Sequence, residues 1–433
     1  MLPQSAVMVT APIAAGHEDA LIDLLAGMNQ GPGLADPGNS LVPFGRFERL
    51  HYARFLILKD PTPDEIAVYN ILPTALTPTL AFFADCDGCG DAFLVDLARQ
   101  CSPGLRSIFT HCVGFGEDTD VLTWLRMHQI PIAATYINWM GRTVRQIRQE
   151  AALFDMISDY LDTHAAALAG HDVQHIHREV VTFVQTQQRN GTITLSPPEP
   201  TPLRWQVQNL LNLIEHPLIF LVASPFLLLG LPLILWRLRW HEKRDPEINA
   251  RPDLVHRADV ATSEDRDISN PYIVIGYLKP GLFRLGLAMV LLRFVEYGSR
   301  HVYKRGRLAR VRSIHFARWV FVNDKKQVIF ASTYDGSLDS YMDDFINKVG
   351  WGLNVLFSNS VGYPKTNWLL RDGASDEMKF KYDLFRHQVK VQVWYKAYPG
   401  LTLFDMYRNS LIRAGIEAKS MTSAQIHDWL DLL

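Results

Sequence analysis

The sequence has no excess of either basic or acidic residues. Its 43 Lys and Arg residues are matched by 45 Asp and Glu residues, which gives a formal net charge of −2. Proteins that bind nucleic acid carry a basic surface, because contacts to phosphates supply most of the affinity. The charge balance therefore argues against a nucleic-acid partner.

The first residues lack the features of a secretory signal. The segment 1–19, MLPQSAVMVTAPIAAGHED, has no Lys or Arg before a short apolar run. A signal peptide has a basic start and a longer apolar core. We therefore expect the N-terminus to remain in the cytoplasm.

Two common hydrolase motifs are also missing. The sequence contains neither a G-x-S-x-G nucleophile elbow nor an H-E-x-x-H zinc helix. No motif therefore supports the usual serine or zinc hydrolases.

Cysteines are few, and all four lie in one stretch, at Cys86, Cys89, Cys101 and Cys112. The first two form a C-x-x-C at an expected strand-to-helix turn, where a helix N-terminus lowers a thiol pKa. The other two do not follow at a usual zinc spacing. Unreactive buried thiols are the favoured interpretation, and a metal or redox role is the alternative.

The chain contains an internal repeat. HYARF at 51–55 matches HFARW at 315–319, and Asp-Gly at 87–88 matches Asp-Gly at 335–336. Further pairs keep the same order: GLRSIFTHCVGF (104–115) with GLNVLFSNSVGY (352–363), and MHQIPIAATY (127–136) with RHQVKVQVWY (386–395). A repeat of this length predicts two copies of one structural unit.

Each copy reads as strand, helix, strand, strand, helix, strand. In the second copy the patterns predict strands at 271–278, 314–322, 327–335 and 389–398, with helices at 282–298 and 337–353. This is the ferredoxin-like βαββαβ order. The predicted fold class is α+β, with two fused ferredoxin-like repeats forming a dimeric α+β barrel within one chain.

A long apolar run lies between the copies. Residues 217–236 contain no charged side chain, and RLRWHEKR follows at 237–244. The run is about long enough to span a bilayer, and a basic, aromatic flank is typical of the headgroup region. A core helix of a folded domain is the alternative interpretation.

We do not expect this run to cross the membrane. A single crossing would place the two copies on opposite sides, where they could not share a barrel. Pro217, Pro225, Gly230 and Pro232 interrupt the run, and proline kinks or breaks a helix. A re-entrant or in-plane segment on the cytoplasmic face is expected.

Three regions follow from these patterns. The first repeat with a helical extension occupies 1–190, and linkers with the membrane-associated segment occupy 191–269. The second repeat occupies 270–433 and is expected to bear the ligand.

The repeated Arg and Asp residues are the first candidate site. Antiparallel pairing of 314–322 with 327–335 is expected to bring Arg318 near Asp335, as Arg54 and Asp87 would be in the first copy. A partly buried ion pair explains a recurring pair most simply. The functional alternative makes Arg318, Asp335 and His315 the catalytic acid–base residues. Strand alternation predicts that His315 and Arg318 point to opposite faces.

The second copy is the richer one in polar and aromatic residues near its expected pocket. His387, Asn359 and Tyr395 are the candidate cofactor-binding residues, and such a pocket suits a flat or lipid-derived ligand. His387 or His315 could be an axial ligand of a haem iron. No metal site outside such a haem is expected.

The doubled plan resembles the superfamily of dye-decolourising peroxidases and chlorite dismutases. STYDG at 332–336 is similar to the G-x-x-D-G peptide of the former, with Asp335 and Gly336 matching and Ser332 in place of the first glycine. The resemblance implies haem in the second half and a distal role for Asp335.

Three classes of function remain open. The expected one is a membrane-associated, haem-dependent, peroxidase-like oxidoreductase acting on a hydrophobic or lipid-derived substrate. The alternatives are a cofactor-free lipid-modifying enzyme using His and Asp and a non-catalytic lipid-binding or scaffold protein. The expected partners are membrane lipid and a hydrophobic small molecule, and association into a homo-oligomer is left open.

Overall fold

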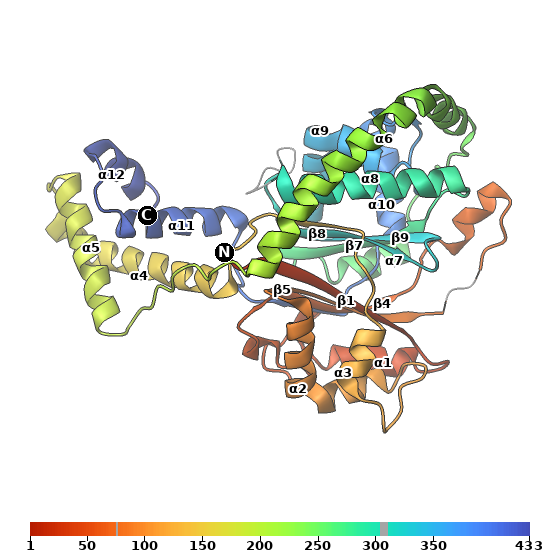
Figure 1. The fold of residues 1–433 in the computed structure, drawn as a ribbon. Helices are drawn as coiled ribbons and strands as arrows, with labels where there is room; N and C mark the ends of the chain where they lie inside the picture. The colour runs from red at the N-terminus through yellow and green to blue at the C-terminus, as the bar shows by residue number, and fades with distance from the viewer. Residues whose placement is uncertain (75–76, 304–310) are drawn as a thin grey trace.

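The computed structural model describes residues 1–74, 77–303 and 311–433. These residues form a mixed α+β structure with two main sheets that face each other (Figure 1). One sheet has six strands in the order β1-β5-β4-β12-β3-β2, and the other has four in the order β6-β8-β9-β7. A two-stranded ribbon pairs β10 with β11.

The element bounds are as follows. The strands are β1 Gln4–Pro12, β2 Asn29–Gly31, β3 Leu34–Ala35, β4 Leu50–Leu58, β5 Thr79–Asp87, β6 Ala134–Ile137, β7 Ser269–Tyr277, β8 Ile314–Val322, β9 Gln327–Asp335, β10 Thr366–Asn367, β11 Arg371–Asp372 and β12 Val393–Lys396. The helices are α1 Glu18–Ala26, α2 Gly90–Phe109, α3 Val121–Met127, α4 Val144–Leu168, α5 Val173–Arg189, α6 Leu203–Arg244, α7 Leu254–Ala261, α8 Leu282–His301, α9 Leu338–Phe357, α10 Glu377–His387, α11 Leu403–Glu417 and α12 Ser423–Leu430.

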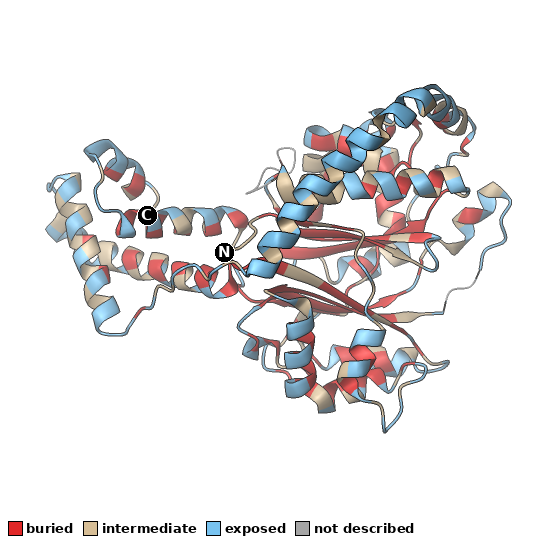
Figure 2. Ribbon diagram, in the orientation of Figure 1, coloured by how far each residue is buried: buried red, intermediate tan, exposed pale blue. Residues whose placement is uncertain are grey.

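Helices cover the outer faces of the two sheets. α1, α2 and α3 lie against the six-stranded sheet, and α8 and α9 against the four-stranded sheet (Figure 1). The long strands β4, β5, β7, β8 and β9 are almost entirely buried (Figure 2), whereas the short strands β2 and β11 are not. The predicted strands and helices of the second copy are present, and the Ser337 hydroxyl accepts a hydrogen bond from the Ser340 N–H as the N-cap of α9.

The last strand of each half passes from its own sheet into the other. The peptide around Gln129 bridges to Val9 in β1, and the chain then continues as β6, which pairs with β8. Likewise, Gln388 bridges to Val274 in β7, and the following β12 pairs with β4. Each half therefore completes the sheet of the other, so the repeats at 1–190 and 270–433 share one structural body.

A helical arm extends from this body. It consists of α4, α5, α11 and α12 and lies at the left of Figure 1. The arm has its own apolar core, formed by Leu153, Ile157, Val180, Val184, Ile193, Ile412, Ile416 and Trp429. α4 and α11 begin at equivalent places in the two repeats, each with a capping box, on Thr143 and Thr402.

The apolar run predicted to contact lipid lies in α6. In the described residues, α6 is the one helix long and apolar enough to cross a membrane, and its most apolar segment is 0% buried. Figure 2 shows α6 as largely exposed along its length. The run is therefore not buried as a core helix would be. The prediction that prolines break it is wrong, because α6 continues as one helix through Pro217, Pro225 and Pro232.

Candidate functional site

A β-bulge at the same place in each half positions a histidine. In β8, Ile314 faces Tyr334 and Phe316 faces Thr333, so His315 is an extra residue in the ladder. The first half has the same irregularity in β4 at His51, between Leu50 and Tyr52. A bulge shifts the alternation of side chains.

The bulge overturns one prediction from strand alternation. The side chains of His315 and Arg318 do not point to opposite faces of the sheet, because both reach the six-stranded sheet. His315 contacts Tyr52 of β4, and Arg318 contacts Val7 of β1. The extra residue at His315 accounts for this change, since it moves the histidine out of the regular two-residue period.

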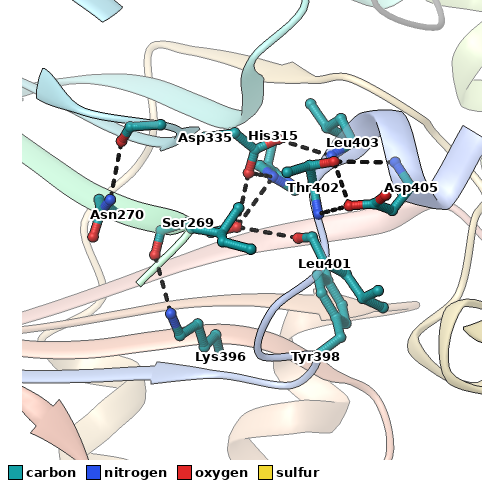
Figure 3. Close-up of polar contacts among 12 residues, drawn as sticks. Ser269, Asn270, His315, Asp335, Lys396, Tyr398, Leu401, Thr402, Leu403 and Asp405 are labelled. Carbon is teal, nitrogen blue, oxygen red and sulfur yellow. Dashed lines mark hydrogen bonds and ion pairs between the residues drawn. The ribbon is translucent and has the colours of Figure 1, made fainter. Parts of the chain in front are cut away.

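Asp335 joins His315 to the start of α11. The Nε2–H of His315 donates to Asp335 Oδ1 at 2.6 Å, and the Leu403 N–H donates to Oδ2 at 2.8 Å (Figure 3). Ser269 Oγ donates to Asp335 Oδ1 at 2.8 Å. On the other side of the ring, the Tyr52 hydroxyl lies 3.0 Å from Nδ1. With Nε2 as donor, Nδ1 accepts from Tyr52; this assignment of the tautomer follows from the hydrogen bonds.

The first half repeats this arrangement with the roles of the halves exchanged. The Nε2–H of His51 donates to Asp87 Oδ1 at 2.9 Å, and the Tyr398 hydroxyl lies 2.9 Å from Nδ1. The Val144 N–H, at the start of α4, donates to Asp87 Oδ2 at 2.9 Å. Each aspartate therefore connects a bulge histidine with the first turn of an arm helix, where a carboxylate is favourable. We call His51–Asp87 and His315–Asp335 the twin clamps.

The twin clamps meet between the sheets. The rings of Tyr52 and Tyr398 lie edge to face with centroids 5.4 Å apart. Burial raises the pKa of both tyrosines, so both hydroxyls keep their protons at neutral pH. A cavity of about 20 Å³ borders His51, His315 and Tyr398, which is room for about one water molecule.

Two buried arginines cross between the sheets. Arg318 forms an ion pair with Asp85 and donates to the Val7 carbonyl at 3.1 Å. Arg54 donates to the Ser332 carbonyl at 3.1 Å and to Thr333 Oγ1 at 2.8 Å. Each guanidinium therefore reaches the strand that precedes an Asp-Gly pair in the opposite half.

The expected pairs of Arg318 with Asp335 and of Arg54 with Asp87 are wrong. In the ladder, Arg318 faces Ala331 and Asp335 faces Ser269, so the two side chains lie at different levels of the sheet. The recurring Arg forms contacts between the sheets and not within one hairpin. The structural interpretation, a buried Arg–carboxylate bridge, therefore applies to Arg318 with a different partner, Asp85.

The two arginines differ in their partners, because Arg318 pairs with a carboxylate and Arg54 contacts neutral groups. Thr333 stands where the other half has Asp85, so Arg54 has a hydroxyl and a carbonyl as partners. Burial, together with the charge of Arg318, lowers the pKa of Arg54 to about 9. The guanidinium also lies 4.8 Å from the Trp394 ring centroid, a favourable place for a desolvated cation.

The predicted cofactor-binding residues do not converge on one pocket. His387 lies in a cluster with Glu65 and Asp383. Asn359 is buried and its Oδ1 accepts from Arg284 at 3.3 Å. Tyr395 belongs to β12 in the six-stranded sheet, where it stacks on Phe44 with ring centroids 5.2 Å apart.

The surroundings of His387 and His315 do not fit a haem. The Nδ1–H of His387 donates to the Asp383 carbonyl at 2.8 Å, and Nε2 faces Glu65 Oε2 at 3.5 Å. The adjoining cavity measures about 30 Å³. Both ring nitrogens of His315 are occupied by Asp335 and Tyr52. Neither imidazole offers a free nitrogen beside a space of haem size.

Sequence patterns gave no signal for the acidic cluster around His387. Glu65 follows β4, and Asp383 lies one helical turn before His387 in α10. Their ligand atoms lie within 4.8 Å of one another, a spacing that could hold a metal ion. However, Arg386 donates to Glu65 at 2.6 Å and to Asp383 at 3.1 Å. Two cations thus already neutralise the two carboxylates, and we interpret the group as a structural ion cluster.

This cluster predicts a loss of stability at high pH. Burial opposes the charged imidazole, but Asp383 and Glu65 outweigh it and raise the pKa of His387 to about 9. Because the pKa of an unfolded histidine is about 6.5, this contribution is complete below that pH and disappears as the pH rises through 9. His387→Gln should therefore be less stable than the parent chain at pH 6, and the difference should shrink by pH 9.5.

Urea unfolding at both pH values measures this effect, which should be on the order of 1–3 kcal/mol at pH 6. The matched control is His427→Gln, because His427 is 70% exposed and lies 3.7 Å from Asp431. An equal difference between the parent and His387→Gln at both pH values would contradict the ion-cluster interpretation.

Three of the four cysteines have the environment of structural thiols, and the expectation of a buried thiol is wrong for Cys89. Cys86, Cys101 and Cys112 are buried, Cys89 is exposed, and all four are free. Burial raises the pKa of Cys86, raises that of Cys101 to about 11 and raises that of Cys112 to about 12. A raised pKa makes a thiol a poor nucleophile and a poor metal ligand.

Comparison with protein-family models, with curated proteins and with solved structures found no match to this chain.

Proposed function

We propose that this chain is a monotopic membrane protein with a scaffolding role. In this proposal α6 attaches the α+β body to one leaflet of a bilayer, and the helical arm extends from the attached body. Of the three classes open from the sequence, this is the non-catalytic one. The exposed apolar surface of α6 carries the proposal.

The middle of α6 is exposed on every side. The consecutive side chains of Leu218, Ile219, Phe220, Leu221 and Val222 are each more than half exposed. Consecutive helical residues point in different directions around the axis. So large an apolar surface is costly in water, and it marks a site of contact with lipid or protein.

Both ends of α6 are fixed to the same body. Near the start, Asn209 and Asn212 accept hydrogen bonds from Arg300 and His301 of α8 at 2.8 Å each. Near the end, Glu242 is buried and accepts from the Thr366 hydroxyl at 2.9 Å. A helix held at both ends by one body can lie in a leaflet, and this supports the in-plane geometry over a crossing.

The duplicated ferredoxin-like barrel is part of the proposal. The repeated motifs, the two facing sheets and the reciprocal exchange of β6 and β12 support it. In such a barrel the interior is the place for a ligand. Here Arg54, Arg318 and the twin clamps occupy that interior, and their partners are groups of the protein itself.

The grooves also favour a scaffold over an enzyme for apolar substrates. A groove of about 690 Å³ lies beside the end of β4 and the residues that precede β12. Charged side chains line it, including Lys59, Asp60, Arg386 and Lys390, whereas pockets for apolar ligands are mostly apolar. The haem-dependent oxidation of a lipid-derived substrate stays a prediction from the sequence.

A second candidate function is proton transfer at the twin clamps. The observation in its favour is the cavity of about 20 Å³ between His51 and His315. An aspartate that orients a histidine, which in turn faces a hydroxyl, is the arrangement used in acid–base catalysis. The size of the cavity restricts such chemistry to water or a molecule of similar size.

Charge placed in α6 should abolish membrane attachment. We expect the parent chain to float with phospholipid vesicles in a density gradient and the variant Leu221→Asp/Leu229→Asp to remain at the bottom. These side chains are 67% and 82% exposed, so the fold should tolerate the change, whereas each carboxylate in the apolar part of a bilayer costs about 2.5–3.5 kcal/mol.

The control is Leu72→Asp/Leu254→Asp, because these leucines are 88% and 84% exposed and lie outside α6. It should float like the parent chain. Cys89 and Ser420 are both exposed. In the variant Ser420→Cys, the thiols at positions 89 and 420 should react with an impermeant maleimide from the same side of sealed vesicles. Flotation of the α6 variant would contradict the proposal. So would a parent chain that binds no vesicles and is a dimer that the α6 variant converts into a monomer, because α6 would then be a protein interface.

A further inference from the structure

The last two turns of α6 carry a second feature that membrane attachment by apolar contact does not require. Directly after the apolar run, the cations Arg237, Lys243 and Arg244 are exposed, and the two arginines lie over the ring of Trp240. We propose that this basic end binds the headgroups of anionic phospholipids, so that the protein selects negatively charged leaflets. The inference rests on the proposed membrane attachment and adds a lipid class to it.

The charges at this end are available for a ligand. Among the described residues, no carboxylate lies within ion-pair distance of Arg237, Lys243 or Arg244. The one acidic residue in this part of the helix is Glu242, which is buried. Its carboxylate accepts hydrogen bonds from Arg239, from the Thr366 hydroxyl and from the backbone N–H groups at 368 and 369. The negative charge of Glu242 is therefore already compensated by groups of the α+β body.

Neighbouring acidic groups are neutralised in the same way. Asp245 is buried and pairs with Lys279 and Arg284. Glu247 lies 3.4 Å from Lys379 and 3.6 Å from Lys365. Although the whole chain has a net charge of −2, the end of α6 therefore presents a local surplus of positive charge.

An aromatic ring holds two of the cations. The guanidinium carbons of Arg237 and Arg244 lie 4.8 Å and 4.4 Å from the Trp240 ring centroid. Tryptophan is enriched at the boundary between the apolar core and the headgroups. Trp240 follows the apolar run by one helical turn, so the cations that it holds lie directly beside the part of α6 that contacts the leaflet.

The start of α8 lies beside this end of α6. The Phe283 ring stacks on His241 with centroids 5.3 Å apart, and the preceding Leu282 is 88% exposed. An exposed apolar side chain next to the cations provides a second contact with the leaflet. Lipid therefore fits this surface better than a soluble anion does, since an anion such as inorganic phosphate would gain nothing from Leu282.

The test compares two vesicle compositions. The parent chain should bind vesicles of phosphatidylcholine with 30 mol% phosphatidylglycerol on the order of 100-fold more tightly than phosphatidylcholine alone, because each cation near an anionic surface adds about fivefold. High salt should remove this preference, because the screening length falls to about 3 Å at 1 M. Flotation over a range of lipid concentrations measures both.

The decisive variant is Arg237→Gln/Lys243→Gln/Arg244→Gln. It should bind phosphatidylcholine as the parent does and lose the preference for phosphatidylglycerol. The matched control is Arg178→Gln/Arg189→Gln/Lys419→Gln, three exposed cations on the helical arm, which should keep the preference. Far-UV circular dichroism and the melting temperature show that each variant is folded.

The outcomes separate this inference from the proposed function. Binding to neither composition would overturn membrane attachment itself. Equal binding of the parent chain to both compositions would leave attachment standing and overturn lipid selection. A preference that survives in the Arg237 triple variant, or is lost equally in the control, would assign the selection to another surface.

Discussion

Replacing Arg318 with Met should lower the free energy of unfolding by about 3–5 kcal/mol. The substitution leaves the Asp85 carboxylate buried without its cation, since both side chains are 1% exposed. An unpaired buried charge is among the most costly defects in a folded protein, because neither water nor a partner compensates it. Urea unfolding at pH 7 measures the change.

The repeat supplies a matched control for this prediction. Arg54→Met removes a guanidinium of the same burial from the equivalent position, but its partners are the Ser332 carbonyl and the Thr333 hydroxyl. The cost of leaving those neutral groups unpaired is about 1–3 kcal/mol. Adding Asp85→Asn to Arg318→Met should recover part of the loss. If Arg54→Met were the more harmful single substitution, the ion pair with Asp85 would not be what holds the two sheets together.

Removing the Asp335 carboxylate should be the second most damaging change. Asp335→Ala deprives three donors of their acceptor: His315 Nε2, Ser269 Oγ and the Leu403 N–H. We expect a loss of about 2–4 kcal/mol, because buried donors without partners cost about 1–3 kcal/mol each and some of them can reach water. Asp335→Asn should cost about half as much, since its amide oxygen still accepts from the Leu403 N–H and the imidazole can change tautomer.

The same experiment separates a clamp from a catalytic site. If the twin clamps hold the arm helices, Asp87→Ala should destabilise the chain about as much as Asp335→Ala, since its carboxylate holds His51 and the Val144 N–H in the same way. Amide exchange should also rise in the first turns of α4 and α11. If Asp335→Ala left the melting temperature unchanged, Asp335 would not have this structural role. That result would favour the interpretation of Asp335 as a catalytic acid–base residue.

The limits of the sequence are clearest at His315. The repeat of HYARF and HFARW correctly located two equivalent strands, and the Asp-Gly pairs located their partners. The bulge that turns His315 toward Tyr52 was not predictable, because nothing in the nine residues of β8 distinguishes a regular ladder from one with an extra residue.

The ion pairs were likewise predicted only in part from the sequence. The sequence indicated that Arg318 and Arg54 have equivalent roles, but Asp85 emerges as a partner of Arg318 only once the two sheets face each other. Glu65 joins His387 for a similar reason, since the chain after β4 folds back over the end of α10. Contacts between residues hundreds of positions apart depend on sheet packing, and no local pattern encodes it.

By itself, the sequence determined the local structure: the strands and helices of the second repeat, the N-cap at Ser337 and the apolar run of α6. These features arise from side-chain periodicity and short-range hydrogen bonds, which a few neighbouring residues specify. The tertiary structure alone decided that β6 and β12 change sheets, that Asp87 and Asp335 join the bulge histidines to the arm helices and that both ends of α6 rest on one body. Each of these is a choice among partners distant in the chain, and packing of the complete core makes that choice.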